Sequence, residues 1–136
     1  MSRILGLDYG MRRIGLALSD PLGIIAKPLI TIDTKYTQDY FLKILEIIID
    51  NNVSKIVVGL PINLKGDNSQ QTEEVLSFLS NLEKKIKLPI ITIDERLSSI
   101  AAEKSLKFQG IKVRDNKSLI DETAAAIFLQ EYLDSL

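Results

Sequence analysis

Three short apolar runs open the chain, and turn residues separate them. The runs cover residues 3–8, 13–19 and 24–32, and each has the length and residue types of a β-strand. Gly10 lies where the chain must reverse after the first run, and Pro21 with Gly23 marks a β-turn after the second. Pro28 predicts an edge position for the third strand, because proline cannot donate a hydrogen bond to a central ladder. The pattern predicts an antiparallel meander.

Beyond this meander, helical and strand patterns alternate along the chain. Helical spacing of apolar residues covers 37–51, 70–85, 96–108 and 119–133, and two buried-strand runs cover 55–59 and 89–94. Gly110 is a typical stop signal after the third helix. Strands that alternate with helices after a meander predict an α/β fold, in which helices cover both faces of a five-stranded mixed sheet.

The length and composition are typical of one folded unit. The chain has 136 residues, of which 46% are hydrophobic, and a chain of this length usually forms one domain with its own core. We therefore expect residues 1–136 to be a single domain. The first residues do not resemble a signal peptide, and no apolar run is long enough to span a bilayer, so we expect a cytoplasmic protein.

Two missing residue types narrow the chemistry. The sequence contains no cysteine and no histidine. Without cysteine, disulfides and thiolate metal sites are excluded. Without histidine, the Ser-His-Asp and Cys-His hydrolases are excluded, as are ribonucleases that use histidine as acid and base. Any hydrolysis by this chain must depend on carboxylates, lysine or a metal ion.

The charge is unevenly distributed along the chain. The net charge is −1, which argues against nucleic-acid binding by bulk charge alone. Residues 84–117, however, contain nine basic and four acidic residues. Such lysines can simply solvate helix faces. Because the same segment contains a carboxylate motif, contact with substrate phosphates is the alternative interpretation.

Two groups of carboxylates stand out at predicted strand ends. Asp8 ends the first apolar run just before Gly10, where an unpaired charge would be costly, although an Asx-turn could also explain it. Asp94 and Glu95 follow the last strand run, at the sheet edge where α/β folds place their sites. Asp94 could equally cap the next helix, with Glu95 in its first turn.

Asp121 is the third candidate. At about 100° per residue, it points to the same side of the last predicted helix as the apolar Phe128. A carboxylate on an apolar face needs a partner, and no basic residue follows Lys117 in the sequence. A metal ion could be that partner, whereas a capping box that begins at Ser118 is the structural alternative. Glu122, on the flank of the same face, is a substitute ligand.

Together, Asp8, Glu95 and Asp121 form a candidate catalytic and metal-binding set. Carboxylate oxygens suit hard divalent cations such as Mg²⁺ or Mn²⁺. Two ions roughly 4 Å apart can activate water and stabilise the leaving oxygen of a phosphodiester. The residues therefore favour a metal-dependent nuclease.

Six motifs in order extend this interpretation. They are Leu5-Gly6-Leu7-Asp8-Tyr9-Gly10, Arg13-Ile14-Gly15-Leu16-Ala17, Ser19-Asp20-Pro21-Leu22-Gly23, Val58-Gly59-Leu60-Pro61, Asp94-Glu95-Arg96-Leu97-Ser98-Ser99, and Asp121 with Ala124-Ala125. Through them the chain resembles, over nearly its whole length, the bacterial YqgF (RuvX) family, described as Holliday junction resolvases and as pre-16S rRNA nucleases. Met11 departs from the family pattern, in which threonine or serine often follows the Asp-x-Gly element, and this removes one candidate phosphate contact.

The resemblance implies a ribonuclease-H-like fold with strand order 3-2-1-4-5. It also places the acidic residues of the family on Asp8, Glu95 and Asp121. The substrate-binding candidates are Arg13 and Arg96, which match motif positions, together with Arg12 and Asn63.

The resemblance favours a nuclease that acts on structured RNA and matures the 5′ end of 16S rRNA. Cleavage of four-way DNA junctions is the alternative substrate. An ATPase of the actin and sugar-kinase type also begins with an Asp-x-Gly turn, but it needs two such domains. A non-catalytic nucleic-acid-binding module is a further alternative, and the three intact carboxylates argue against it. Because the sheet should cover the one apolar face of each helix, we expect a monomer or weak homodimer.

Overall fold

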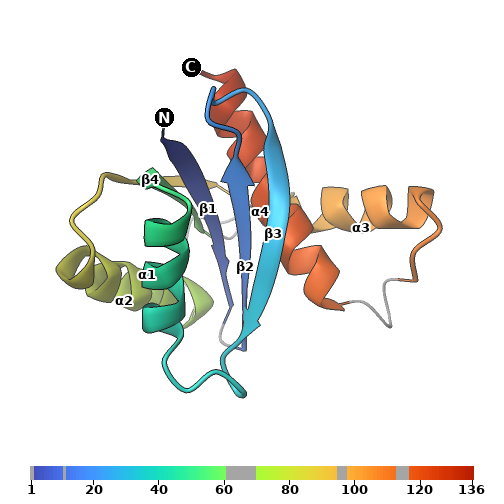
Figure 1. The fold of residues 1–136 in the computed structure, drawn as a ribbon. Coiled ribbons are helices and arrows are strands. Elements are labelled where there is room, and N and C mark those ends of the chain that lie inside the picture. The colour runs from blue at the N-terminus through green and yellow to red at the C-terminus, as the bar shows by residue number, and fades with distance from the viewer. Residues whose placement is uncertain (1, 11, 61–69, 95–97, 113–116) are drawn as a thin grey trace.

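One five-stranded mixed sheet forms the centre of the molecule (Figure 1). The computed structural model describes residues 2–10, 12–60, 70–94, 98–112 and 117–136. The strands are β1 (Arg3–Tyr9), β2 (Arg13–Ser19), β3 (Ala26–Asp33), β4 (Val53–Leu60) and β5 (Ile90–Asp94). They lie in the order β3-β2-β1-β4-β5, with antiparallel pairing among the first three and parallel pairing of β1 with β4 and of β4 with β5. The predicted meander and strand order are confirmed.

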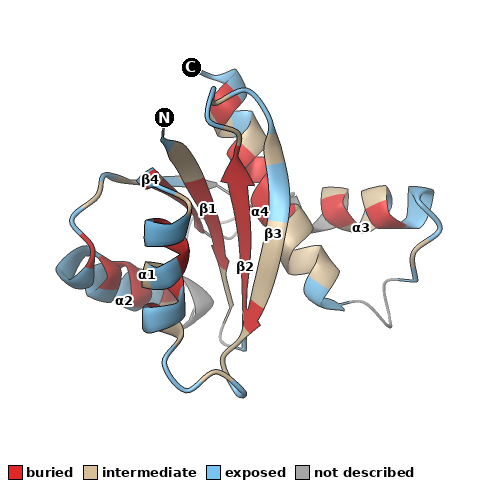
Figure 2. Ribbon diagram, viewed as in Figure 1, coloured by how far each residue is buried: buried red, intermediate tan, exposed pale blue. Residues whose placement is uncertain are grey.

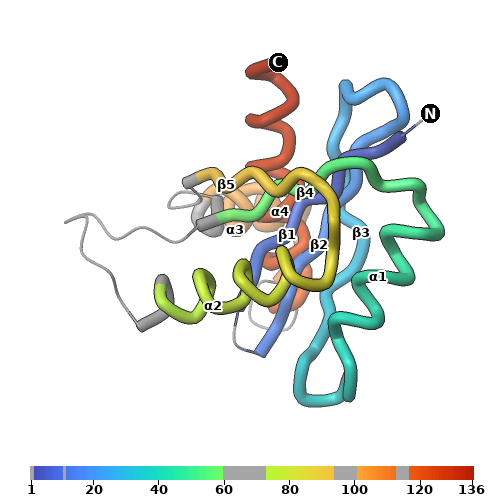
Figure 3. The backbone as a smooth tube through the Cα atoms, turned by 90° about the vertical axis from the view of Figure 1, so that its left-hand side faces the viewer, coloured from blue at the N-terminus to red at the C-terminus, as the bar shows by residue number. Residues whose placement is uncertain are grey.

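Helices cover both faces of this sheet, as predicted. They are α1 (Tyr40–Asp50), α2 (Gln70–Lys85), α3 (Ser98–Phe108) and α4 (Lys117–Asp134). The helices α1 and α2 pack on one face and α4 packs on the other. Figure 3 shows α2 in front of the strands and α1 beside β3. The helix α3 packs against α4 and projects away from the sheet (Figure 1).

Two hydrophobic clusters hold these layers together, one on each face of the sheet. The larger cluster joins the sheet to α1 and α2 through residues such as Leu7, Ile44 and Leu82, each with no exposed surface. The smaller cluster joins the other face to α4 through Val57 and Phe128. Figure 2 shows the buried residues concentrated on β1, β2 and the inner sides of the helices. The central strands are therefore buried on both faces, as parallel sheets require.

The element boundaries shift where a side chain binds the backbone. The strand β3 begins at Ala26 and not at Ile24, because the Asp20 carboxylate accepts hydrogen bonds from the backbone N–H groups of Ile24 and Ile25 at 2.7 and 2.8 Å. The helix α1 begins three residues later than predicted, because the Asp39 side chain caps its first turn. The edge position predicted from Pro28 is confirmed, since β3 ends the sheet.

The arrangement of α3 differs from the expectation that the sheet covers every apolar helix face. Because α3 packs against α4, the two helices and β3 border an open groove of about 530 Å³. The groove is lined by apolar residues such as Leu106, Ile111 and Ile127. Amphipathic spacing shows that a helix has an apolar face but not which element covers it. In the part of the chain that the structure describes, no helix is long and apolar enough to cross a membrane.

Candidate active site

Two of the predicted acidic residues, Asp8 and Asp94, lie at one edge of the sheet. The strands β1, β4 and β5 are parallel, so their carboxyl ends meet at this edge. Asp8 lies one residue before the end of β1, beside Gly15 on β2 and Gly59 on β4. Asp94 is the last residue of β5. This is the edge at which open α/β sheets place their sites.

Asp8 faces the layer that contains α4. A Cβ atom at Gly6, two residues earlier on β1, would lie 3.1 Å from the Leu129 Cβ of α4. Residues two apart in a strand share a face, so Asp8 also faces α4. Only 9% of Asp8 is exposed. The paired residues Gly15 and Gly59 carry no side chain.

The helix α4 passes directly over Gly15 and brings Asp121 to the same place. A Cβ atom at Gly15 would overlap the backbone of Asp121 and would lie 2.7 Å from the backbone nitrogen of Glu122. Real Cβ atoms do not approach other atoms so closely, so only glycine permits this packing. Because Gly15 is the β2 partner of Asp8, the close approach brings Asp8 and Asp121 together from opposite ends of the described chain.

Arg13 is the partner of Asp121. Its Nε donates a 2.6 Å hydrogen bond to Asp121 Oδ2, and the side chains of Arg13 and Asp121 are 36% and 22% exposed. The absence of a cation near Asp121 in the sequence suggested a metal as its partner; the structure supplies a guanidinium from 108 positions away. The capping-box alternative does not describe this residue, since Ser118 lies inside α4 and the Asp121 carboxylate binds Arg13.

Two neighbouring acidic residues of α4, Asp121 and Glu122, are partly buried at the site. Burial raises the pKa of the Asp121 carboxyl, and Arg13 opposes this shift with its hydrogen bond and its charge. Burial also raises the pKa of Glu122, and the negative charge of Asp121 adds to the effect. Desolvated carboxylates with raised pKa values are typical of sites that bind cations or move protons.

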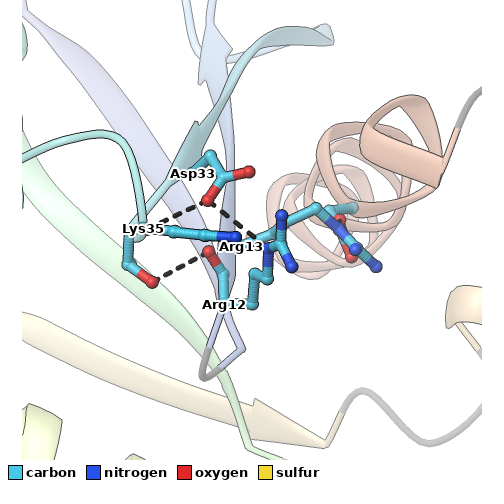
Figure 4. A network of polar contacts seen from close by, with 6 residues as sticks. Arg12, Arg13, Asp33 and Lys35 are labelled. Atoms are coloured by element: carbon cyan, nitrogen blue, oxygen red, sulfur yellow. Dashed lines mark hydrogen bonds and ion pairs between the residues drawn. The ribbon is translucent and has the colours of Figure 1, made fainter.

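A second ion pair lies beside the first, at the ends of β2 and β3. Arg12 Nε lies 3.6 Å from Asp33 Oδ1, and 56% of the Arg12 side chain is exposed. Figure 4 shows Arg12, Arg13, Asp33 and Lys35 gathered at this edge, with the Arg13 side chain extending toward α4. Arg13 is thus held inside the site, while Arg12 remains open to solvent.

The other predicted site residues fall outside the residues that the structure describes. These are Glu95, Arg96 and Asn63, together with Met11. Within the described residues, no group of three or more carboxylates lies close enough to hold a metal ion. Asp8 and Asp121 nevertheless fit part of such a site, because they offer hard oxygen ligands from one face of the sheet edge. A complete ligand set needs at least one more residue.

Gly15 and Gly59 belong to the sequence motifs, but their pairing with Asp8 and the close approach of α4 to Gly15 were not predicted. Gly15 and Gly59 lie within predicted strands, where glycine weakens the strand and often marks the close approach of another backbone. The signal was therefore present at Gly15, but the element that approaches it could not be identified from local pattern.

The strand order, the acidic sheet edge and the helix that covers it define a nuclease of the ribonuclease-H-like class. The family described as "RuvX: Holliday junction resolvase" matches residues 2–135. The chain belongs to this RuvX family, and its enzyme class is that of a hydrolase of phosphodiester bonds.

Individual relatives agree with this assignment. The chain is 45% identical over 133 residues to a Desulforamulus reducens protein named "Putative pre-16S rRNA nuclease", with 98% of this chain and 97% of that protein covered. It is 43% identical over 133 residues to a protein of the same name from Roseiflexus, with 98% and 94% covered.

Two solved structures share the fold at low sequence identity. The RuvC protein of T. thermophilus in complex with a Holliday junction substrate matches with a TM-score of 0.60 and 15% identity, over 99% of this chain and 95% of that one. The Fowlpox virus resolvase bound to Holliday junction DNA matches with a TM-score of 0.58 and 11% identity, over 98% and 97%. These likenesses confirm the ribonuclease-H-like fold predicted from the sequence.

Proposed function

We propose that this chain is a metal-dependent nuclease whose reaction takes place at the Asp8–Asp121 edge of the sheet. The observation that carries the proposal is the close approach of the α4 backbone at Asp121 to Gly15, the β2 partner of Asp8, which brings these two acidic residues to one edge of the sheet. Family membership supplies the reaction class, which is hydrolysis of phosphodiester bonds.

Asp8 and Asp121, with Glu95 as the third ligand, would hold the metal. Glu95 directly follows the last residue of β5 in the sequence, which is the sheet edge that Asp8 occupies. A bound Mg²⁺ or Mn²⁺, or a pair of them, supplies an activated water and offsets the charge on the phosphate. The hydrogen bond from Arg13 fixes the orientation of the Asp121 carboxylate, so that its oxygens are positioned before the metal arrives.

Precursor 16S rRNA is the proposed substrate, and Arg12, Arg13, Arg96 and Asn63 are the proposed substrate-binding residues. The relatives that share more than 40% of their residues with this chain carry the name pre-16S rRNA nuclease, whereas the resolvases share 15% or less. Maturation of rRNA would place the protein in the cytoplasm. A four-way DNA junction is the second candidate, because the family description names it.

We propose a monomer or weak homodimer for the active species. The exposed large apolar side chains form small groups on separate elements, among them Leu22, Ile24 and Ile25 in the β2–β3 turn, Leu42 and Ile49 on α1, and Phe108 on α3. A tight dimer buries about 800 Å² per partner around a continuous apolar centre, and we propose that these separate groups do not form one.

Parallel cleavage assays test the substrate. Precursor 16S rRNA and a synthetic four-way junction are each incubated with the protein in Mg²⁺, in Mn²⁺ and in EDTA. We expect trimming of the RNA in either metal, 5′-phosphate and 3′-hydroxyl products, and no cleavage in EDTA. Symmetric nicking of the junction by a tight dimer that ignores the RNA would replace the proposal with a resolvase. Full cleavage in EDTA would exclude a metal-dependent reaction.

A further inference from the structure

A short turn beside the proposed site carries an exposed aromatic ring. The 34–37 turn follows β3, and its Tyr36 is 75% exposed. Among the described residues, Tyr36 and Phe108 are the aromatic side chains exposed to this degree. Phe108 ends α3, which projects away from the sheet, whereas Tyr36 lies three residues after Asp33 at the edge that holds the ion pairs.

The backbone of this turn is held in place although its ring is not buried. Thr34 donates two hydrogen bonds to the Arg12 carbonyl oxygen, from its backbone nitrogen at 2.7 Å and from its hydroxyl at 2.9 Å. Tyr36 N–H donates to the Asp33 carbonyl at 3.2 Å, and Lys35 N–H donates to the Asp33 carboxylate at 3.0 Å. These hydrogen bonds therefore hold the 34–37 turn against the β1–β2 connection.

One cation lies over the exposed ring, and a second belongs to the segment that holds the turn. The Lys35 ammonium lies 5.5 Å from the centre of the Tyr36 ring. Arg12, to which the turn is bonded, has a largely exposed guanidinium. Arg12 precedes Arg13, the partner of Asp121, and Lys35, Arg12 and Arg13 lie close together at the same edge of the sheet (Figure 4).

We infer that the 34–37 turn is a stacking subsite for an unpaired nucleotide of the substrate. A base would lie against the Tyr36 ring, and the flanking phosphates would contact Lys35 and Arg12. This inference rests on the proposed nuclease function. An aromatic ring on a positively charged surface is the usual arrangement for binding single-stranded nucleic acid, because every base has a face on which an aromatic ring can stack. The enzyme would then require an unpaired nucleotide next to the bond it cleaves.

A binding experiment in EDTA tests the subsite without cleavage. Hairpins of RNA and of DNA, each with a single-stranded extension or with a blunt end, carry 2-aminopurine in the extension or at the terminal pair. Affinity is measured by anisotropy, and stacking is measured by quenching of the 2-aminopurine fluorescence. The variants are Tyr36→Ala, Tyr36→Phe and, as the matched control for an exposed aromatic residue, Phe108→Ala.

We expect Tyr36→Ala to lower the affinity for extended hairpins by roughly 5- to 100-fold, the loss that removal of one stacking partner produces. Fluorescence quenching should disappear with it. Tyr36→Phe should retain both properties, and Phe108→Ala should match the natural protein. Blunt hairpins should bind equally to all variants. A difference between the RNA and DNA extensions would show which nucleic acid the subsite accepts.

Three results would overturn the inference while leaving the nuclease proposal intact. These are unchanged binding by Tyr36→Ala, an equal loss for blunt and extended hairpins, and failure of Tyr36→Phe to restore quenching. By contrast, a natural protein that neither binds nor cleaves any of these nucleic acids would contradict the nuclease proposal itself. The two failures are thus distinguishable.

Discussion

Arg13 Nε and Asp121 Oδ2 form a 2.6 Å hydrogen bond between the second strand and the last described helix. The two residues are 108 positions apart in the sequence, and the bond joins β2 to α4 at the edge of the sheet where the proposed site lies. It also affects the proton affinity of the site, because Arg13 is the group that opposes the rise in the Asp121 pKa. Arg13 is therefore a positioning residue as well as a candidate for substrate contact.

Removal of Arg13 should raise the pKa of Asp121 further. In Arg13→Gln, burial would act on the carboxyl without an opposing charge. Carboxyl titration by ¹³C NMR of the metal-free protein measures this shift directly. Arg12→Gln is the control, since Arg12 pairs with Asp33 instead, and it should leave the Asp121 titration unchanged. An unshifted Asp121 in Arg13→Gln would mean that the bond has no electrostatic effect in solution.

Arg13 should also affect the salt dependence of substrate binding. If Arg13 contacts a substrate phosphate, Arg13→Ala should reduce the salt dependence of binding by about one counterion. Measurement of affinity over a series of salt concentrations provides this slope. An unchanged slope would restrict Arg13 to its ion pair with Asp121.

Loss of a proposed metal ligand should abolish cleavage but preserve the fold. For Asp8→Asn, Glu95→Gln and Asp121→Asn, we expect kcat to fall by at least about 100-fold, since each change removes stabilisation of the transition state. Circular dichroism should remain unchanged in each variant. Glu122→Gln is the matched control, because Glu122 lies next to Asp121 on α4. If Glu122→Gln lost activity and Asp121→Asn kept it, the ligand on α4 would have to be reassigned.

Gly15→Ala should damage activity more than stability. The added Cβ would overlap the Asp121 backbone, so α4 must move, at a cost of about 1–3 kcal/mol for overpacking. Because this movement displaces Asp121 from Asp8, kcat should also fall strongly. Gly23→Ala is the control: its φ of +71° makes alanine unfavourable, but nothing lies within 4 Å of the new atom. That variant should lose stability on thermal melting and keep its activity.

Asp20 should make the stability of the protein depend on pH at acidic values. Hydrogen bonds from the backbone N–H groups of Ile25, Ile24 and Leu22 hold the pKa of this carboxyl below its ordinary value of 3.8. A lowered pKa in the folded state gives a contribution to stability that is present above the unfolded value and is lost as the pH falls through the folded value. Asp20→Ala should therefore lower the Tm at pH 7, and the difference should shrink below pH 3.8. Thermal melting of the natural protein and of Asp20→Ala at pH 7 and at a pH below 3.8 measures this difference in Tm. The same difference at both pH values would contradict the electrostatic explanation.

Local patterns in the sequence were sufficient to predict the elements of this fold. The periodicity of apolar residues gave all five strands and four helices, because burial on one or both faces leaves a repeating signature. The starts of β3 and α1 were displaced, since Asp20 and Asp39 bind backbone groups that periodicity does not describe. The position of α3 against α4 depends on packing between elements, which no local pattern encodes.

The sequence identified candidate residues of the site but not the contacts between them. Asp8 and Asp121 were recognised because a carboxylate on an apolar strand or helix face is unusual. The pairing of Asp121 with Arg13 depends on the register of β1 and β2 and on the contact of α4 with Gly15. Those are properties of the assembled sheet, so the sequence could suggest a metal or a capping box for Asp121, but not Arg13.

The distance along the chain between Asp8 and Asp121 has a consequence for synthesis of the protein on the ribosome. Asp8 emerges with the first strand, but Asp121 emerges with the last described helix, about 110 residues later. At ~5–20 residues per second, this interval lasts roughly 6–20 s. During that time the nascent polypeptide contains β1 without the carboxylate that completes the proposed centre. The proposed active centre is therefore incomplete until α4 has docked, and the nascent polypeptide should not cleave nucleic acid before that step.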